Sequence, residues 1–324
     1  MIKWVLILLL VLLIFLIYPM IRVRFFSSVK VKEPAIGSNP EVKNLHQHIH
    51  YLSERIGSRS AFEYEKINAA KDYIERVLKD LRLEYTLQSY QYRGKTYSNI
   101  IVTRQGQGKS GEVFIIGAHY DTVMGTPGAD DNASAVAVLL ELCRLLTDYQ
   151  PSKTLKLIFF VLEEPPTFNT RHMGSYVYAK AAKDNKEKIT GMISLEMVGY
   201  YNDKKGSQLY PLPLMSLFYP KTANFIGVVG DIKSRRLVKK VAHSIKKGSA
   251  IPVESLSTVK ILPGVDFSDH GSFWKMGYPA VMITDTAFYR NPNYHSISDT
   301  IATLDFDKMV ELLPGLRQVV LDLT

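Results

Sequence analysis

The residues of this chain best suited to chemistry are acidic and histidine side chains that follow apolar runs. His119 comes directly after the run VFIIGA, and Glu196 comes after MISL. Glu163 and Glu164 follow the run LIFFVL. Nearly continuous apolar runs are typical of strands covered on both faces, and the carboxyl ends of parallel strands meet at one edge of a sheet. We therefore expect these side chains to lie together there, where nitrogen and oxygen ligands with one carboxylate to spare would suit a hydrolytic zinc site.

Two further segments add candidates to this set. Asp130 and Asp131 stand in GADDNASA, just before a helical pattern, and His295 lies in the turn-rich segment NPNYHSISDT. A helix N-terminus favours one capping acid, but two adjacent acids exceed what a cap requires, and one carboxylate could bridge two metals. Asp121, two residues after His119, is placed to fix the second ring nitrogen of that histidine.

The adjacent glutamates Glu163 and Glu164 suggest a division of roles. Two acids at the end of a buried strand are costly unless they are paired or bound to metal, so a solvated pair is the less favoured interpretation. Consecutive side chains on an extended chain point in opposite directions. One glutamate can therefore bind a metal while the other takes a proton from a nucleophilic water.

Other residues that could bind metal have simpler explanations. His46, His48 and His50 alternate in HQHIH, which fits an amphipathic helix or surface segment better than a metal site. His270, in SDHG, is equally compatible with a pocket and with a structural role. Cys143 lies in the helical pattern AVAVLLELCRLL as a buried thiol, and a single cysteine excludes an intrachain disulfide.

The order of the elements indicates the fold class. Strands are expected at residues 113–118, 155–162, 192–195 and 280–283, with 225–229 as a fifth candidate. They alternate with helical patterns at residues 132–146, 174–183, 234–247 and 306–323. Strands at 84–92 and 98–103 form a hairpin pattern near a sheet edge. The sequence thus predicts an α/β fold with three layers: a mostly parallel mixed central sheet with helices on both faces.

The N-terminal segment predicts attachment to a membrane. Residues 4–21 form an apolar run without charge that is just long enough for a transmembrane helix. A cleaved signal peptide is the rival, but the run ends in Tyr18, Pro19 and Met20 without a small-residue cleavage site. We therefore expect an anchor, or an uncleaved signal, at residues 1–24, a linker at 25–40 and the catalytic domain at 41–324. The side of the membrane on which that domain lies stays open.

The net charge of +9 does not predict a nucleic-acid partner. Five basic residues precede the first acid, Glu33, and the rest of the chain carries 35 basic against 31 acidic residues. No basic face interleaved with aromatic residues is evident. The N-terminal basic residues would instead face anionic lipid headgroups.

Five separated segments, in this order, resemble the M28 metallopeptidases, the zinc aminopeptidase family with a co-catalytic pair of metals. The resemblance covers roughly residues 45–322 and implies two Zn²⁺ ions per chain. The metal ligands that it implies are His119, Asp130, Glu164, Glu196 and His295. It implies Asp130 as the bridging ligand, a cis peptide between Asp130 and Asp131, Glu163 as the general base, and Asp121 as the residue that orients His119. The fourth ligand is often Asp in the family and is Glu196 here.

The resemblance implies an exopeptidase that acts on peptides, in the first place an aminopeptidase. Tyr200, Tyr201 or the proline-rich loop 204–223 would shape its specificity pocket. Three alternatives stay open. They are a glutaminyl-cyclase-like acyltransferase, a carboxypeptidase or dipeptidase on the same fold, and a non-catalytic membrane scaffold. The presence of His119, Glu196 and Glu163 argues against the first and the last of these, because such relatives lack some of the ligands or the base.

Overall fold

The computed structural model describes residues 39–260 and 262–324. The predicted membrane anchor and nearly all of the predicted linker lie outside these residues. Among the helices that the structure describes, none combines the length and the apolar character needed to cross a membrane.

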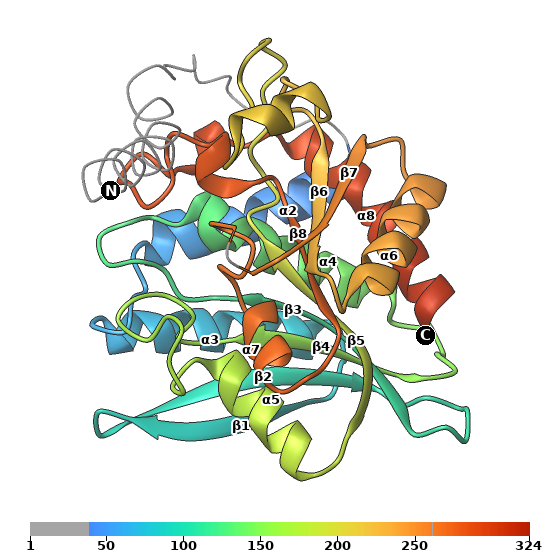
Figure 1. Ribbon diagram of the computed structural model, residues 1–324. Helices are drawn as coiled ribbons and strands as arrows, with labels where there is room; N and C mark the ends of the chain where they lie inside the picture. The colour runs from blue at the N-terminus through green and yellow to red at the C-terminus, as the bar shows by residue number, and fades with distance from the viewer. Residues whose placement is uncertain (1–38, 261) are drawn as a thin grey trace, which may run out of the picture.

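A single eight-stranded sheet forms the centre of the molecule, in the order β1-β2-β4-β3-β5-β8-β6-β7 (Figure 1). The strands are β1 (Tyr85–Tyr92), β2 (Lys95–Arg104), β3 (Glu112–His119), β4 (Thr154–Phe160), β5 (Lys188–Glu196), β6 (Ile226–Asp231), β7 (Val253–Thr258) and β8 (Ala280–Thr284). Strands β4, β3, β5 and β8 run parallel at the centre. The β1–β2 hairpin pairs antiparallel at one edge, and β6 runs antiparallel to β8 and parallel to β7. The mixed, mostly parallel sheet and its edge hairpin are confirmed.

The central strands are apolar throughout because both of their faces are covered. Ile115 and Ile116 are consecutive residues of β3, so their side chains point to opposite faces of the sheet. Both are fully buried, Ile116 in the larger hydrophobic core and Ile115 in the smaller one. This explains why alternation of apolar and polar residues is missing from these strands.

Helices cover both faces of the sheet (Figure 1). They are α2 (Pro40–His50), α3 (Tyr64–Asp80), α4 (Ala135–Leu145), α5 (Gly174–Asp184), α6 (Arg235–Gly248), α7 (His270–Lys275) and α8 (Phe306–Leu323). Side chains of α2, α3, α4, α6 and α8 enter the larger core, and those of α5 and α7 enter the smaller one. Helices α6 and α8 pack so closely at Gly315 that a Cβ there would lie only 2.9 Å from Ile245 Cγ2.

Some elements differ from the prediction. The helix expected from residue 132 begins at Ala135, because the backbone at Asp131 (φ −101°, ψ 90°) and Asn132 (φ −132°, ψ 35°) is not helical. Strand β7 and the short helix α7 were not predicted, since VESLST is polar and partly exposed and α7 has only 6 residues. The segment 204–223 is largely loop, as predicted, with one 3₁₀ turn at Pro213–Leu217.

Candidate active site

The side chains predicted to do chemistry gather at the carboxyl edge of the central strands. His119 ends β3, Glu163 and Glu164 follow β4, and Glu196 ends β5. His295 reaches the same place from the loop after β8. Ligand atoms within 4.8 Å of one another form three overlapping groups: His119, Glu163 and Glu164; His119, Asp131 and Glu196; and Asp131, Glu164 and His295.

Asp131 joins two of these groups. Its Oδ1 lies 3.5 Å from His119 Nε2, and its Oδ2 lies 3.1 Å from His295 Nε2. Glu196 Oε2 is 3.3 Å from the same nitrogen of His119, and Glu164 Oε1 is 3.4 Å from that of His295. Asp131 is therefore the carboxylate shared by two sets of three potential ligand residues, one with His119 and Glu196 and the other with Glu164 and His295.

The structure corrects the prediction for Asp130. Its Oδ1 accepts a hydrogen bond from the backbone N–H of Gly199 (2.9 Å), and its Oδ2 accepts one from Asn291 Nδ2 (2.6 Å). Both oxygens are thus engaged away from the cluster, and Asp131 occupies the position between the two ligand sets. The cis peptide bond also lies one residue later than expected, between Asp131 and Asn132. The backbone turns at Asp131 (φ −101°, ψ 90°), which sends the two adjacent carboxylates to different places.

Two buried residues hold the loop that carries Asp131. The carboxylate of Asp299 accepts hydrogen bonds from the backbone N–H groups of Asp130 (2.8 Å) and Asp131 (3.1 Å). Arg59 is fully buried and donates to five backbone carbonyls. These carbonyls belong to Leu52, Gly57, Tyr120, Pro127 and Gly128. Sequence reasoning missed Arg59, because nothing in IGSRS distinguishes a buried arginine from an exposed one.

Asp121 acts on its neighbours in two ways. Its backbone oxygen lies 3.2 Å from His119 Nδ1, so that nitrogen carries the hydrogen and Nε2 is left for a metal. Its carboxylate accepts hydrogen bonds from the backbone N–H groups of Glu163 (3.1 Å) and Glu164 (3.0 Å). The carboxylate also lies near His119, with Oδ1 3.7 Å from the same Nδ1. Asp121 therefore contacts His119 as predicted, through both its carbonyl and its carboxylate, and the carboxylate also fixes the glutamate pair.

Three of the strained backbone positions lie beside the cluster. Leu162 (φ 60°), Met197 (φ 48°) and His295 (φ 53°) all adopt the left-handed conformation without being glycine. Leu162 precedes Glu163 and Met197 follows Glu196, so the strain falls where a strand end turns its glutamate into the cluster. Each such residue costs about 1–3 kcal/mol and is typical of sites where the geometry serves function.

The electrostatics of the cluster favour a bound cation. Burial raises the pKa of Glu163 well above its ordinary range despite nearby His119, and the Glu164 and Glu196 charges raise it further. Burial and the Asp131 charge raise the pKa of Glu164 to about 7. Asp131 Oδ1 is buried without a hydrogen-bond partner. So many buried acids and an unpaired oxygen are stabilised by divalent metal, and a set of imidazole and carboxylate ligands fits zinc.

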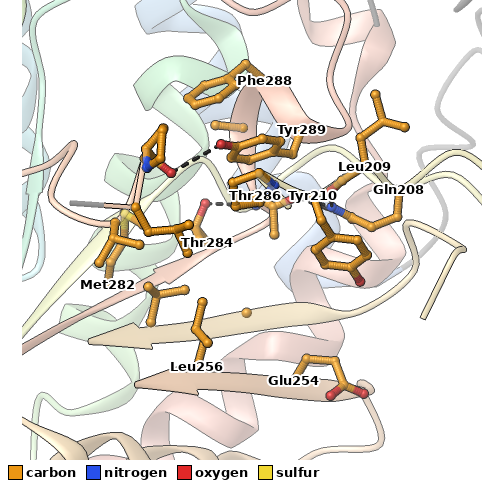
Figure 2. A pocket seen from close by; sticks show the side chains of 18 of the residues that line it. Gln208, Leu209, Tyr210, Glu254, Leu256, Met282, Thr284, Thr286, Phe288 and Tyr289 are labelled. Carbon is orange, nitrogen blue, oxygen red and sulfur yellow. Dashed lines mark hydrogen bonds between the residues drawn. The ribbon is translucent and has the colours of Figure 1, made fainter. Parts of the chain in front are cut away.

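A pocket opens beside the cluster and extends over the sheet face of β8, β6 and β7. Glu196 and Tyr294 lie at the cluster end, where the Tyr294 ring stacks on His295 with 3.7 Å between centroids. Figure 2 shows Tyr210 and Tyr289 on one side of the pocket, across from β6 and β7. Its lining includes residues of the loop 204–223, as predicted, but not Tyr200 or Tyr201, whose side chains are buried elsewhere.

The other histidines and the cysteine have structural surroundings. His48 is buried, and its Nδ1 is 2.7 Å from the hydroxyl of the buried Tyr73 on α3. His270 is fully buried and donates from Nε2 to the carbonyl of Val265 (2.8 Å). Cys143 is buried in α4. In the part of the chain that the structure describes, none of these joins the three ligand groups.

The chain matches a known protein family and several known proteins. The model of Peptidase family M28 matches residues 99–320. The chain is 39% identical over 290 residues to the uncharacterized protein YfbL of Escherichia coli (strain K12), covering 87% of this chain and 88% of that protein. It is 25% identical over 296 residues to the probable aminopeptidase YDR415C of Saccharomyces cerevisiae, covering 87% and 71%.

A solved structure shares the fold. BSAP, a zinc aminopeptidase from Bacillus subtilis, matches with a TM-score of 0.69 at 15% identity, covering 91% of this chain and 96% of that one. The mixed eight-stranded sheet with its flanking helices is therefore the zinc aminopeptidase fold.

Proposed function

This chain belongs to peptidase family M28, and we propose that it is a zinc-dependent aminopeptidase that removes N-terminal residues from peptides. The observation that carries the proposal is the position of Asp131, which is shared by two sets of ligand residues, with Glu163 next to both. The family and the names of its relatives support the same reading.

Two zinc ions are proposed, one held by His119, Asp131 and Glu196, and one by Asp131, Glu164 and His295. The unpaired Oδ1 of Asp131 and the free Nε2 of His119 support this assignment. When bound, the ions would supply Lewis acidity that makes a water molecule nucleophilic and stabilises negative charge on the scissile carbonyl oxygen.

Glu163 is proposed as the general base. Its Oε2 lies 3.9 Å from His119 Nε2, and the hydrogen bond from its backbone N–H to Asp121 holds it in place. Its raised pKa suits a group that first takes a proton from water and then gives it to the leaving amine.

The pocket favours an aminopeptidase over a carboxypeptidase. Of the described residues that line it, two are acidic, Glu196 and Glu254, and none is lysine, arginine or histidine. A substrate whose terminal carboxylate entered this pocket would meet no cationic partner, so the lining disfavours a carboxypeptidase.

The test uses the full chain, loaded with zinc in detergent, and a mixed pool of peptides that includes N-terminal Gln and N-acetylated members. Products are identified by mass spectrometry beside the Glu163→Gln variant. Stepwise loss of N-terminal residues from the free peptides alone, absent in the variant, is the expected result. Loss of ammonia from Gln peptides alone would indicate a cyclase. Loss of C-terminal residues would indicate a carboxypeptidase, and a zinc-bound protein that cleaves nothing would contradict the proposal.

Membrane attachment is proposed separately, from the apolar run at residues 4–21. The full chain is expected to remain in the membrane pellet after an alkaline carbonate wash and to be extracted by detergent. A chain without residues 1–24 is expected in the supernatant. Release of the full chain by carbonate would contradict the anchor, and protease protection of sealed vesicles would give the side of the catalytic domain.

A further inference from the structure

One row of paired residues crosses the floor of the pocket from the metal cluster to β7. Glu196 on β5 pairs with Thr284 on β8, Thr284 pairs with Gly227 on β6, and Gly227 pairs with Glu254 on β7. Residues paired across a sheet share a face, and all four line the pocket. Neighbouring strands lie about 4.8 Å apart, so Glu254 stands about 14 Å from Glu196 along the floor.

The floor is shaped to accept a long side chain along this row. Gly227, between Thr284 and Glu254 in the row, has no side chain, and a Cβ there would lie 3.2 Å from the backbone oxygen of Thr284 and 3.6 Å from Thr286 Cγ2. Beside it runs a second row, in which Met282 pairs with Val229. Val229 in turn pairs with Leu256, so this row offers an apolar surface along the same direction.

Glu254 stands at the far end among aromatic rings. Figure 2 shows its side chain on β7, with Tyr210 on the opposite wall. Tyr219 lies against the same strand, because its hydroxyl donates to the carbonyl of Ser255 (3.2 Å), the residue after Glu254. Aromatic faces and a carboxylate together form a favourable environment for a cation.

The structure supplies no cation of its own to this carboxylate. Within residues 39–260 and 262–324, no lysine, arginine or histidine nitrogen lies within 4.0 Å of Glu254. Arg290, the buried cation next to this region, donates from Nε to Gln208 Oε1 (2.9 Å) and from Nη1 to the carbonyl of Phe225 (2.8 Å). Its Nη2 is buried without a hydrogen-bond partner, and it too lies more than 4.0 Å from the Glu254 carboxylate. Glu254 is therefore available to a cationic group that enters the pocket.

We infer that Glu254 is a specificity determinant and that the enzyme prefers peptides with N-terminal lysine or arginine. The inference rests on the proposed aminopeptidase function. The alkyl stem of the substrate's first residue lies along Met282, Val229 and Leu256 over the gap at Gly227, and its cationic end meets Glu254 and the Tyr210 and Tyr219 rings.

The experiment compares kcat/KM for peptides that differ only in the first residue, using the zinc-loaded full chain. Lysine and norleucine are the critical pair, because they share the four-carbon stem and differ in the terminal ammonium group. We expect lysine to exceed norleucine by at least about tenfold, and Glu254→Gln to reduce this ratio by about tenfold. Glu254→Lys is expected to shift preference toward N-terminal glutamate. Glu65→Gln removes the same charge from an exposed position on α3 and is the matched control, with an unchanged ratio.

A second variant tests the same inference independently, in case substitution of Glu254 impairs folding. Gly227→Val fills the passage and is expected to reduce cleavage of lysine peptides more than that of alanine peptides. Equal cleavage of lysine and norleucine peptides by the unmodified chain would overturn the inference and leave the aminopeptidase function intact. An unchanged ratio in Glu254→Gln would also overturn it. Failure to cleave any peptide would instead refute the proposed function on which the inference rests.

Discussion

The carboxylate of Asp299 accepts a hydrogen bond from the backbone N–H of Asp131 (3.1 Å), although the two residues are 168 positions apart in the chain. Asp299 follows His295 in the same loop and also accepts the N–H of Asp130. The loop that carries one proposed ligand, His295, therefore fixes the loop that carries the shared ligand, Asp131. The two metal positions are coupled through this contact before any metal binds.

Replacement of Asp299 tests this coupling. Asp299→Ala is expected to lower zinc affinity and kcat/KM by about 10–100-fold, because residues that support metal ligands have effects of this size. Zinc per chain is measured by elemental analysis after dialysis against a weak chelator. Asp307→Ala, at an exposed position in the first turn of α8, is the control and keeps its zinc. Full zinc occupancy in Asp299→Ala would show that the loop contact is not needed.

The assignment of Asp131, rather than Asp130, as the shared ligand gives a paired prediction. Asp131→Asn is expected to lose both zinc ions, because its carboxylate belongs to both ligand sets. Asp130→Asn is expected to keep them and to lose about 1–3 kcal/mol of stability, because an amide nitrogen then faces a hydrogen-bond donor. Zinc analysis and urea unfolding separate the two effects. The opposite pattern would restore Asp130 to the role that the resemblance implied.

The general position of the site is accessible from sequence for a simple reason. A strand buried on both faces appears as a continuous apolar run, and the polar residue that ends it marks the edge of the sheet. His119, Glu163, Glu164 and Glu196 all follow such runs, and the structure brings them together. His295 lacks this signal, since no strand directly precedes it; it was a candidate because a histidine stands in the turn-rich segment NPNYHSISDT, and the resemblance then implied its role as a ligand.

Other features depend on geometry that the sequence does not encode locally. Whether Asp130 or Asp131 faces the cluster is decided by the backbone turn at Asp131 and by hydrogen bonds from Gly199 and Asn291, which come from distant segments. Glu254 lies on the pocket floor only because the register of β7 against β6 pairs it with Gly227. Because β7 is a polar edge strand, neither its existence nor that register could be predicted.

Arg59 makes a prediction about stability. Its guanidinium is fully buried, and burial lowers its pKa to about 10 in spite of nearby carboxylates. Arg59→Met would leave five backbone carbonyls without their donor, and we expect a loss of about 3–5 kcal/mol in the free energy of unfolding. Urea unfolding measures the loss. Arg55→Met, at an exposed position on the same segment, should change stability little. An equally small loss for Arg59→Met would show that its hydrogen bonds to the five carbonyls do not stabilise the fold.

His270 predicts how stability depends on pH. It is fully buried, with its ring edge-on to Trp274, and burial lowers its pKa to about 4 from the ordinary 6.5. Between about pH 6.5 and about pH 4, His270 is protonated in the unfolded chain but not in the folded chain. The free energy of unfolding therefore falls as the pH drops through this range. Below about pH 4 both states carry the proton, and this group changes the stability no further. The loss is about 3 kcal/mol across the window, at about 1.4 kcal/mol for each pKa unit.

The measurement is the free energy of unfolding in urea at several pH values for the full chain and for His270→Gln, which cannot take up a proton. The variant is expected to lose about 3 kcal/mol less between pH 7 and pH 4 than the unmodified chain, whatever its stability at pH 7. Titration of the metal ligands is common to both proteins and cancels in the comparison. His243→Gln, at an exposed position on α6, is the control and should follow the unmodified chain. Parallel pH curves for His270→Gln and the unmodified chain would mean that His270 takes up its proton as readily in the folded protein as in the unfolded one.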